Sequence, residues 1–396
     1  MKMIRCLLMV SLALVGACDR MRGQKGGDEG TSGGDTILVG EFGSFTGSEA
    51  TFGQSTHNGI MLALKEINAA GGVKGKKIEV KWLDDAGKTQ EAGLAVTRLI
   101  TENHVVAVLG EVASSLSLAG GRVAQQKGIP MISPSSTNPD VTDLGDMIFR
   151  VCFIDPFQGY VGAKFARETL KAQKAAILYD QAQAYSQGLR EEFKKAFLKL
   201  GGEVVTEQAF SGGDSDFSAQ LTTIRDAKPD VIYLPGYYTD VGNTVLQARK
   251  LGMTQPFLGG DGWDSAQLAK IAGSAIEGSY YSNHYSHEDT RPAVQNFVKK
   301  YKAEFNAVPD GLAALGYDSM VILADAMKRA ASLGGKDLAK AISETKDFPA
   351  VTGIITIDEH RNPHKPAVVV MMKNGTPTYV TTIDPPTYAT TINPPK

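Results

Sequence analysis

Two neighbouring serines stand where a helix begins and could hold an anion. Ser114 and Ser115 follow an apolar run at residues 105–109 that reads as a buried parallel strand. The first N–H groups of a helix lack intrahelical acceptors, and the helix dipole is positive at that end, so an anion is favoured there. Either serine could instead be a plain N-cap residue. The local sequence leaves both interpretations open.

Further polar and aromatic side chains follow other predicted strands. In doubly wound sheets, ligands bind beyond the carboxyl ends of the strands, so side chains at these positions could line one cleft. Each residue alone could equally serve packing or a turn, and their shared placement is what favours a site. They are Ser135, Ser136 and Thr137 between two prolines, Tyr185, Tyr237 with Tyr238, and Asp261.

Signatures of common enzyme and metal sites are absent from the sequence. There is no GxxxxGK[ST], GxGxxG after a strand, HExxH, GxSxG or CxxC. A calcium-like start at Asp214 and Asp216 lacks the required later glycine and glutamate. His284 and His287 could bind a metal, but no third ligand is evident, so we interpret them as a surface pair. We therefore expect no enzyme, no cofactor and no metal.

The elements that must position these residues form two α/β series. The first alternates strands and helices over residues 36–133, and the pattern restarts after residue 156. Such alternation predicts two doubly wound parallel sheets. Helices return at residues 293–345, and hinges are expected near residues 155, 285 and 360. The predicted strands are 36–40, 77–83, 105–109, 130–133, 175–180, 203–210, 231–235, 256–259, 353–357 and 368–373; the helices before residue 293 are 54–70, 89–101, 114–126, 156–170, 186–200, 216–226, 239–251 and 264–272.

Length and charge agree with this organisation. The chain has 396 residues, enough for two or three domains with cores of their own. Its formal net charge is only -2, so nothing points to nucleic acid as a partner.

The N-terminus reads as an export signal with a lipid anchor. Lys2 and Arg5 precede an apolar stretch that ends Val15-Gly16-Ala17-Cys18, a pattern that resembles a bacterial lipoprotein signal. We expect residues 1–17 to be removed, Cys18 to be lipidated on a membrane surface, and the glycine-rich residues 18–35 to form a flexible tether. Cys152 is then the only other cysteine left, so no intramolecular disulfide is possible.

The C-terminus carries a short internal repeat. Residues 378–386, TYVTTIDPP, are followed at once by TYATTINPP at residues 387–395. Two copies are too few for a repeat fold, and paired prolines keep each copy out of a central strand. We interpret residues 387–396 as a duplicated, mobile tail.

An ordered set of motifs runs from about residue 36 to about residue 377. It consists of Gly40-Glu-Phe-Gly-Ser44-Phe-Thr-Gly47-Ser-Glu-Ala50-Thr-Phe52-Gly53, Asn68-Ala-Ala-Gly-Gly-Val-Lys-Gly75, Asp84-Asp85, Ile132-Ser-Pro-Ser-Ser-Thr137, Asp180 with Tyr185 and Gly188, Gly236-Tyr237, and the Asp261 loop. In this set the chain resembles the bacterial periplasmic Leu/Ile/Val-binding proteins of ABC importers.

The resemblance implies a type I periplasmic binding protein, with two α/β lobes joined by a three-strand hinge that close on a ligand. It places residues 36–155 plus 286–358 in the N-terminal lobe and 156–285 plus 359–386 in the C-terminal lobe. It also implies a free L-amino acid as ligand, branched-chain or otherwise aliphatic, and ABC permease subunits as membrane partners of a monomeric receptor.

The resemblance further assigns roles to the candidate residues. Ser114 and the loop Ser135, Ser136 and Thr137 hold the α-carboxylate and α-ammonium, and Asp261 helps to bind the ammonium. Phe52, Tyr185 and Tyr237 surround the ligand. The family's best-known members have a disulfide where this chain has Ala86 and Ala113, so that bridge is missing.

Other functions stay open at this point. The same trap could serve as a sensor subunit for a membrane receptor, or could bind an amide or an aromatic acid. An exported hydrolase is a more distant alternative, because the catalytic motifs are absent.

Overall fold

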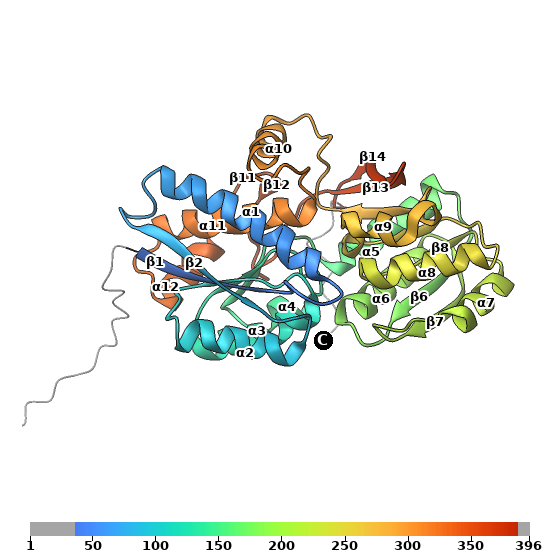
Figure 1. Ribbon diagram of the computed structural model, residues 1–396, viewed down its shortest axis with the longest axis horizontal. Coiled ribbons are helices and arrows are strands. Elements are labelled where there is room, and N and C mark those ends of the chain that lie inside the picture. Colours follow the sequence, from blue (N-terminus) through green and yellow to red (C-terminus); the bar gives the residue numbers. More distant parts are fainter. Residues whose placement is uncertain (1–35, 387–396) are drawn as a thin grey trace, which may run out of the picture. The chain divides into compact units, whose positions relative to one another are not determined.

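The computed structural model describes residues 36–386, which contain two large sheets built mainly of parallel strands and one two-stranded antiparallel sheet. The first sheet has the strand order β2-β1-β3-β4-β5, and all of its pairings are parallel. Figure 1 shows α1 on one side of its strands and α2 and α3 on the other. Its elements are β1 (Thr36–Gly43), α1 (Ala50–Ala69), β2 (Lys77–Asp84), α2 (Thr89–Thr101), β3 (Val108–Leu109), α3 (Ser114–Lys127), β4 (Met131–Ser133), α4 (Asp140–Asp143) and β5 (Ile148–Arg150).

The second sheet has the order β14-β13-β10-β9-β8-β6-β7, and only β13 runs opposite to the other strands, so its pairings with β10 and β14 are antiparallel. Its strands are β6 (Lys174–Asp180), β7 (Glu203–Phe210), β8 (Val231–Tyr233), β9 (Phe257–Gly259), β10 (Tyr280–Asn283), β13 (Ala367–Lys373) and β14 (Thr376–Ile383). Its helices are α5 (Asp155–Lys164) with the π turn η1 (Phe165–Thr169), α6 (Ala184–Lys199), α7 (Ser218–Ala227), α8 (Tyr238–Lys250), η2 (Asp261–Trp263), α9 (Ala266–Ala272) and η3 (Gly273–Ile276).

Three late helices return to the first sheet. The longest of them, α11, packs along α1 so closely that two glycines are required at the contact. A Cβ atom at Gly59 would overlap the carbonyl oxygen of Ala313, and one at Gly316 would overlap that of Thr56. The returning elements are α10 (Pro292–Phe305), α11 (Gly311–Arg329), α12 (Gly335–Ser343), β11 (Phe348–Ala350) and β12 (Gly353–Ile355).

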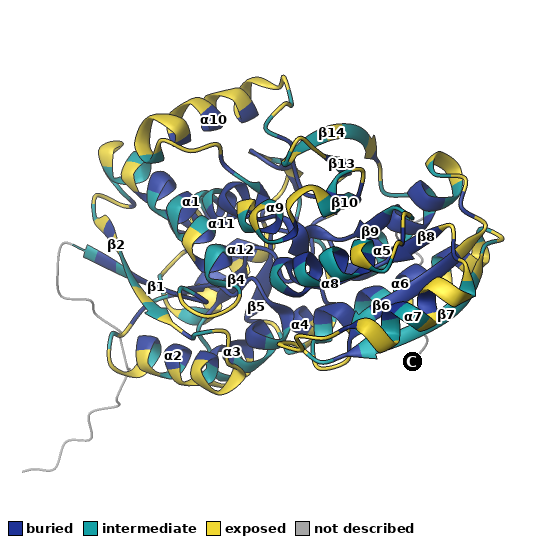
Figure 2. Ribbon diagram, turned by 45° about the vertical axis from the view of Figure 1, so that its right-hand side comes forward, coloured by how far each residue is buried: buried dark blue, intermediate teal, exposed yellow. Residues whose placement is uncertain are grey.

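The core lies along the strands of both sheets. Residues 175–178 of β6 and the whole of β8 are buried, as expected for parallel strands covered by helices on both faces. Figure 2 shows these strands in dark blue, while the outer faces of α7 and α10 are yellow. Helices also bury one apolar face, and the buried residues of α2 are Ala92, Ala95, Val96 and Leu99, spaced as the helical periodicity of the sequence requires.

Chain segments cross between the two sheet units three times: between β5 and α5, after β10, and between β12 and β13. These crossings lie near the expected hinges, while the lobe limits given above stay a prediction. The first copy of the C-terminal repeat forms β14, an edge strand, where flanking prolines are tolerated. Residues 1–35, including Cys18, and the second copy at 387–396 lie outside the described residues.

Among residues 36–386, no helix is both long and apolar enough to cross a membrane.

Candidate ligand-binding site

The structure places every predicted site residue of the folded region just beyond a strand. Phe52 lies in α1, after β1. Ser114 is the first residue of α3, after β3, and the loop 135–137 follows β4. In the second sheet, Tyr185 lies at the start of α6, Tyr237 precedes α8 and Asp261 opens η2. Candidates from both sheet units therefore occupy equivalent positions, at the carboxyl ends of parallel strands.

Three aromatic rings connect the two units. The Phe52 and Tyr237 rings are 5.5 Å apart and nearly perpendicular, at 84°. Tyr237 stacks on Tyr185, with 5.2 Å between centroids and 11° between planes. All three side chains are buried. Tyr238, which the sequence analysis placed beside Tyr237 after the same strand, adds a second edge contact to Phe52 at 5.1 Å.

Direct hydrogen bonds join the same two units. The Thr51 and Ser265 hydroxyls lie 2.9 Å apart, and Thr239 donates to the Ser48 carbonyl at 2.6 Å. The backbone N–H of Ala184 donates to the Ser115 hydroxyl at 3.0 Å. The lobes are therefore in contact, as in a closed trap.

Asp261 lies at the centre of a buried polar network. Its Oδ1 accepts hydrogen bonds from the Tyr185 hydroxyl at 2.9 Å and from Gln158 Nε2 at 2.8 Å. Its Oδ2 lies 2.9 Å from Nε2 of His284. Gly260 precedes it, and a Cβ atom there would overlap the Tyr185 hydroxyl. Glycine at this position therefore lets the tyrosine reach the carboxylate.

His284 corrects one expectation from the sequence. Its side chain is fully buried, so the interpretation of His284 and His287 as a surface pair is wrong for this residue. Burial lowers the pKa of His284 to about 4, although the hydrogen bond to Asp261 partly opposes this shift. The ring is therefore neutral at neutral pH and donates from Nε2, since the Asp261 carboxylate can only accept. It also stacks on Phe153 at 3.8 Å.

The start of α3 is open to a ligand. Its N-cap residue is Ala113, with no side-chain cap, so neither Ser114 nor Ser115 is the N-cap residue. Within the described part of the chain, the backbone N–H groups of Ser114 and Ser115 have no acceptor. Ser114 is buried, and its hydroxyl accepts a long hydrogen bond of 3.4 Å from the Asn138 N–H. An anion at this helix start would find free donors.

The loop after β4 presents two buried hydroxyls without partners. Neither the Ser135 nor the Thr137 hydroxyl has a partner at full hydrogen-bond geometry in residues 36–386, and Thr137 lies close enough to the buried Asp155 carboxyl to oppose the rise of its pKa. Ser136 differs, because its hydroxyl lies 2.7 Å from that of Ser117 and contacts the Glu111 carbonyl at 3.0 Å. Ser136 thus holds the loop from within, and its hydroxyl offers no free donor to a ligand.

Buried Arg150 fixes the shape of this loop. Its guanidinium donates to the carbonyls of Ser136 and Asn138, the latter at 2.8 Å, and to the Thr142 hydroxyl at 3.0 Å. No carboxylate pairs with it in the described structure, and burial lowers its pKa. Sequence reasoning missed Arg150, Gln158 and His284, because nothing local marks them as neighbours of the loops that they support.

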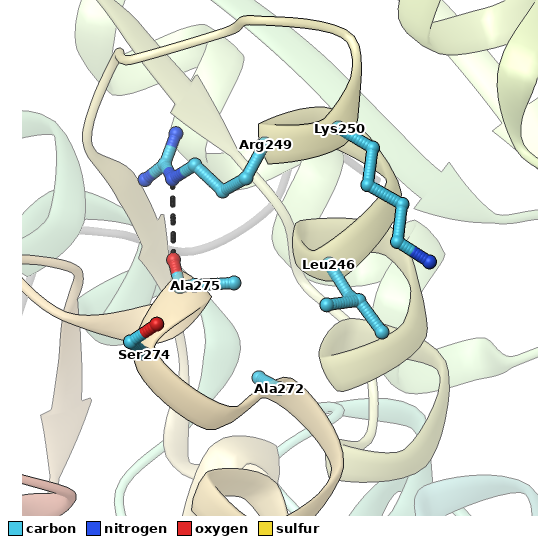
Figure 3. A pocket seen from close by; sticks show the side chains of 6 residues that line it. All are labelled: Leu246, Arg249, Lys250, Ala272, Ser274 and Ala275. Atoms are coloured by element: carbon cyan, nitrogen blue, oxygen red, sulfur yellow. Dashed lines mark hydrogen bonds between the residues drawn. The ribbon is translucent and has the colours of Figure 1, made fainter.

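Hollows elsewhere on the surface involve none of the predicted residues. One of about 400 Å³ lies between α8 and η3, where Arg249 donates to the Ala275 carbonyl at 3.1 Å (Figure 3). A groove of about 550 Å³ is lined by Phe153, Phe157 and Tyr160 among others. Among the described residues, no group of three His, Cys, Asp or Glu side chains could hold a metal.

Comparisons with known proteins agree with this geometry. A family model described as periplasmic binding protein matches residues 36–377. The Leu/Ile/Val-binding protein homolog 1 of Brucella suis is 32% identical over 84% of this chain and 89% of its own length. The leucine-specific-binding protein of Salmonella typhimurium is 34% identical over 82% of this chain and 87% of its own.

Solved structures show the same architecture. The leucine binding protein LivK of Thermotoga maritima superimposes with a TM-score of 0.85 at 38% identity, covering 88% of this chain and 99% of that one. The substrate binding protein LivJ of Streptococcus pneumoniae, solved in complex with isoleucine, gives 0.84 at 35% identity over 88% and 100%.

Proposed function

Because the chain belongs to the periplasmic binding protein family, among the Leu/Ile/Val-binding proteins, we propose that it serves an ABC importer as its extracytoplasmic substrate-binding lipoprotein. The family consists of non-catalytic solute-binding proteins. The proposed ligand is a free L-amino acid with a branched aliphatic side chain, captured between the lobes and passed to the membrane permease. One observation carries this proposal. The buried Asp261 carboxyl, the free N–H groups at the start of α3 and the three aromatic rings all follow the carboxyl ends of parallel strands.

An amino acid has two fixed opposite charges, and the site offers a partner for each. The ligand carboxylate would meet the free N–H groups of Ser114 and Ser115 together with the Ser114 hydroxyl. The ammonium would meet Asp261 and the unpartnered Thr137 hydroxyl. Asp261 has room for it, because Oδ1 already accepts two hydrogen bonds whereas Oδ2 accepts one.

The ligand side chain would lie against Phe52, Tyr185 and Tyr237. Their rings provide an apolar surface, which favours aliphatic groups over charged ones. Support for the branched-chain class comes from the relatives named for leucine and from the homologue solved with isoleucine. The lipid anchor rests on Val15-Gly16-Ala17-Cys18 alone.

Calorimetry on the purified protein tests the ligand. Leucine, isoleucine and valine should bind, whereas the α-keto acid of leucine, which keeps the carboxylate and side chain but lacks the ammonium, should bind at least about a hundredfold more weakly. Equal affinity for the amino acid and the keto acid would overturn the assigned ammonium site. Binding of an aromatic acid, with no amino acid bound, would overturn the ligand class.

A further inference from the structure

Two buried carboxyl groups meet beneath the proposed carboxylate site. Asp85 follows β2 and Glu111 follows β3, and Ser44, after β1, lies between them. The Ser44 hydroxyl is 2.9 Å from Asp85 Oδ1 and 3.1 Å from Glu111 Oε1. Both acidic residues are at most 1% exposed. Three adjacent strands of the first sheet thus end on one hydrogen-bonded cluster.

The hydrogens available at this cluster are too few for two ionised carboxylates. Ser44 has a single hydroxyl hydrogen, so it can donate to one carboxyl oxygen only. Asp85 Oδ2 is buried with no partner, and no Lys, Arg or His in residues 36–386 pairs with either acid. One additional proton resolves this arrangement: a protonated carboxyl donates to Ser44, and Ser44 donates to the other carboxylate.

The surrounding charges favour the same protonation. Burial, with a smaller contribution from the charge of Asp84 beside it, raises the pKa of Asp85 to about 6. Burial, together with the charge of Asp85, holds the pKa of Glu111 well above its usual range. Two further titratable groups lie nearby: Tyr237, whose pKa is raised by burial and by the charge of Glu111, and Glu49, whose carboxyl lies beside Gly87. None of these neighbours is a cation.

The pair is joined directly to the helix start that the ligand would use. Glu111 Oε2 accepts the backbone N–H of Ala113, the N-cap residue of α3. Oε1 also accepts the Ser44 N–H at 2.9 Å. The Glu111 carbonyl is held by the hydroxyls of Ser133 and Ser117 at 2.8 and 3.0 Å. A second negative charge on the pair would therefore lie next to the free N–H groups of α3 and oppose an incoming carboxylate.

We propose that Asp85 and Glu111 share one proton through Ser44, and that this proton keeps the start of α3 competent to bind the ligand carboxylate. Both acids are then positioning residues, which act on the ligand through α3. The coupling to affinity rests on the proposed function, whereas the shared proton does not. Ligand binding becomes linked to retention of the proton and weakens at alkaline pH.

Asp85→Asn is the variant that tests this proposal. The Asn oxygen can keep the hydrogen bonds from Ser44 and from the Gly87 N–H at 3.0 Å, while its NH₂ replaces the unpartnered Oδ2. Glu111→Gln is less suitable, because both oxygens of Glu111 accept backbone N–H groups. Asp84→Asn is the control, since it removes the neighbouring charge that contributes to the raised pKa of Asp85 but leaves both members of the pair in place.

The first measurement uses ligand-free protein and follows the side-chain carboxyl resonances by carbon NMR against pH. We expect the pair to retain one proton at pH 7 in the wild type and in Asp84→Asn. In Asp85→Asn the one titration left, that of Glu111, should move to lower pH, because the charge of Asp85 no longer raises its pKa. Two carboxylates that are both ionised at pH 7 would overturn the shared proton, whichever ligand the protein binds.

The second measurement is the Kd for leucine between pH 6 and pH 8.5. In the wild type and in Asp84→Asn, Kd should rise by about fivefold or more across this range. In Asp85→Asn it should change by less than about twofold, because the variant cannot acquire the second charge. The same pH dependence in Asp85→Asn as in the wild type would overturn the link to binding. If leucine does not bind at any pH, the proposed function fails, and the NMR result still decides the proton.

Discussion

Asp261 is a buried acidic side chain whose hydrogen-bond partners carry no positive charge at neutral pH. Its neighbours Tyr185, Gln158 and neutral His284 provide hydrogen bonds and no formal charge. A ligand ammonium would therefore supply the only formal positive charge in direct contact with it. This arrangement explains why the proposed site should select amino acids over apolar acids that lack an ammonium group.

Replacing Asp261 with Ala should weaken leucine binding by at least about a hundredfold, since a buried charge left unpaired costs about 3–5 kcal/mol. Calorimetry measures the change. Asp216→Asn, an exposed acid of the same sheet unit, is the matched control and should bind as the wild type does. Normal affinity in Asp261→Ala would remove this residue from the ammonium site.

Burial of His284 should make the folded protein less stable at acid pH. The folded-state pKa is about 4, below the usual value of 6.5, so the unfolded chain binds a proton that the folded chain does not. The contribution of His284 therefore makes the unfolding free energy fall as the pH drops from about 6.5 to about 4. Above pH 6.5 this contribution does not change with pH. Denaturant unfolding at a series of pH values should show a shallower decline in His284→Gln than in the wild type. If the unfolding free energy declined equally in His284→Gln and in the wild type, groups other than His284 would be the cause.

Part of the site could be predicted at the level of residues, and the reason is positional. Ser114, Thr137, Tyr185, Tyr237 and Asp261 each follow a strand, and strands are visible in the sequence as apolar runs. The partners of Asp261 were not predictable in this way. Gln158 is 103 residues away in the chain and His284 is 23 residues away, so their approach depends on how the crossing segments fold back.

At the level of elements, the close contact between α1 and α11 depends on glycine. Gly59→Ala places a methyl group on the Ala313 carbonyl oxygen, so the two helices must separate. We expect a loss of about 1–3 kcal/mol in unfolding free energy. Gly93→Ala in α2, where the nearest atom would be 3.9 Å away, is the control and should be neutral or stabilising by up to about 1 kcal/mol. Equal effects of the two substitutions on denaturant unfolding would contradict this interpretation.

The long helices and strands were predictable, because their apolar periodicity is sustained. The 89–101 helix and the 203–210 strand have the predicted limits. The strand predicted at 105–109 is only Val108–Leu109, and the three-residue strand β5 was not predicted. The edge strand β14 was missed because its prolines argue against a central strand, and sequence alone does not show which strand is at the edge.

The two copies of the C-terminal repeat should differ in importance. The first copy is the edge strand β14, paired with β13 along its length. Deleting residues 387–396 should leave the melting temperature and the Kd for leucine nearly unchanged, because β14 remains. Deleting residues 376–396 also removes β14 and exposes β13, so the melting temperature should fall clearly. A large fall in the shorter deletion would show that the second copy packs.

For the whole molecule, the proposed lipid anchor would set where the receptor works. Cys18→Ala should move the protein from the membrane fraction to the soluble fraction when cells are lysed and centrifuged, because the thioether can no longer form. Cys152→Ala is the matched control and should remain with the membrane. Membrane association of Cys18→Ala at the wild-type level would contradict a lipid anchor at this residue.

The polar cluster at the ends of the first three strands has a consequence for how the molecule can be assembled. The resemblance described above implies a disulfide in related receptors at the positions that Ala86 and Ala113 occupy here. In this chain, Ser44, Asp85 and Glu111 join the same two loops by hydrogen bonds. Cys152, the only cysteine in residues 36–386, is buried and unpaired. The folded region should therefore reach its native state without thiol-oxidising enzymes and keep its activity in strong reductant, including when it is produced inside a reducing cytosol.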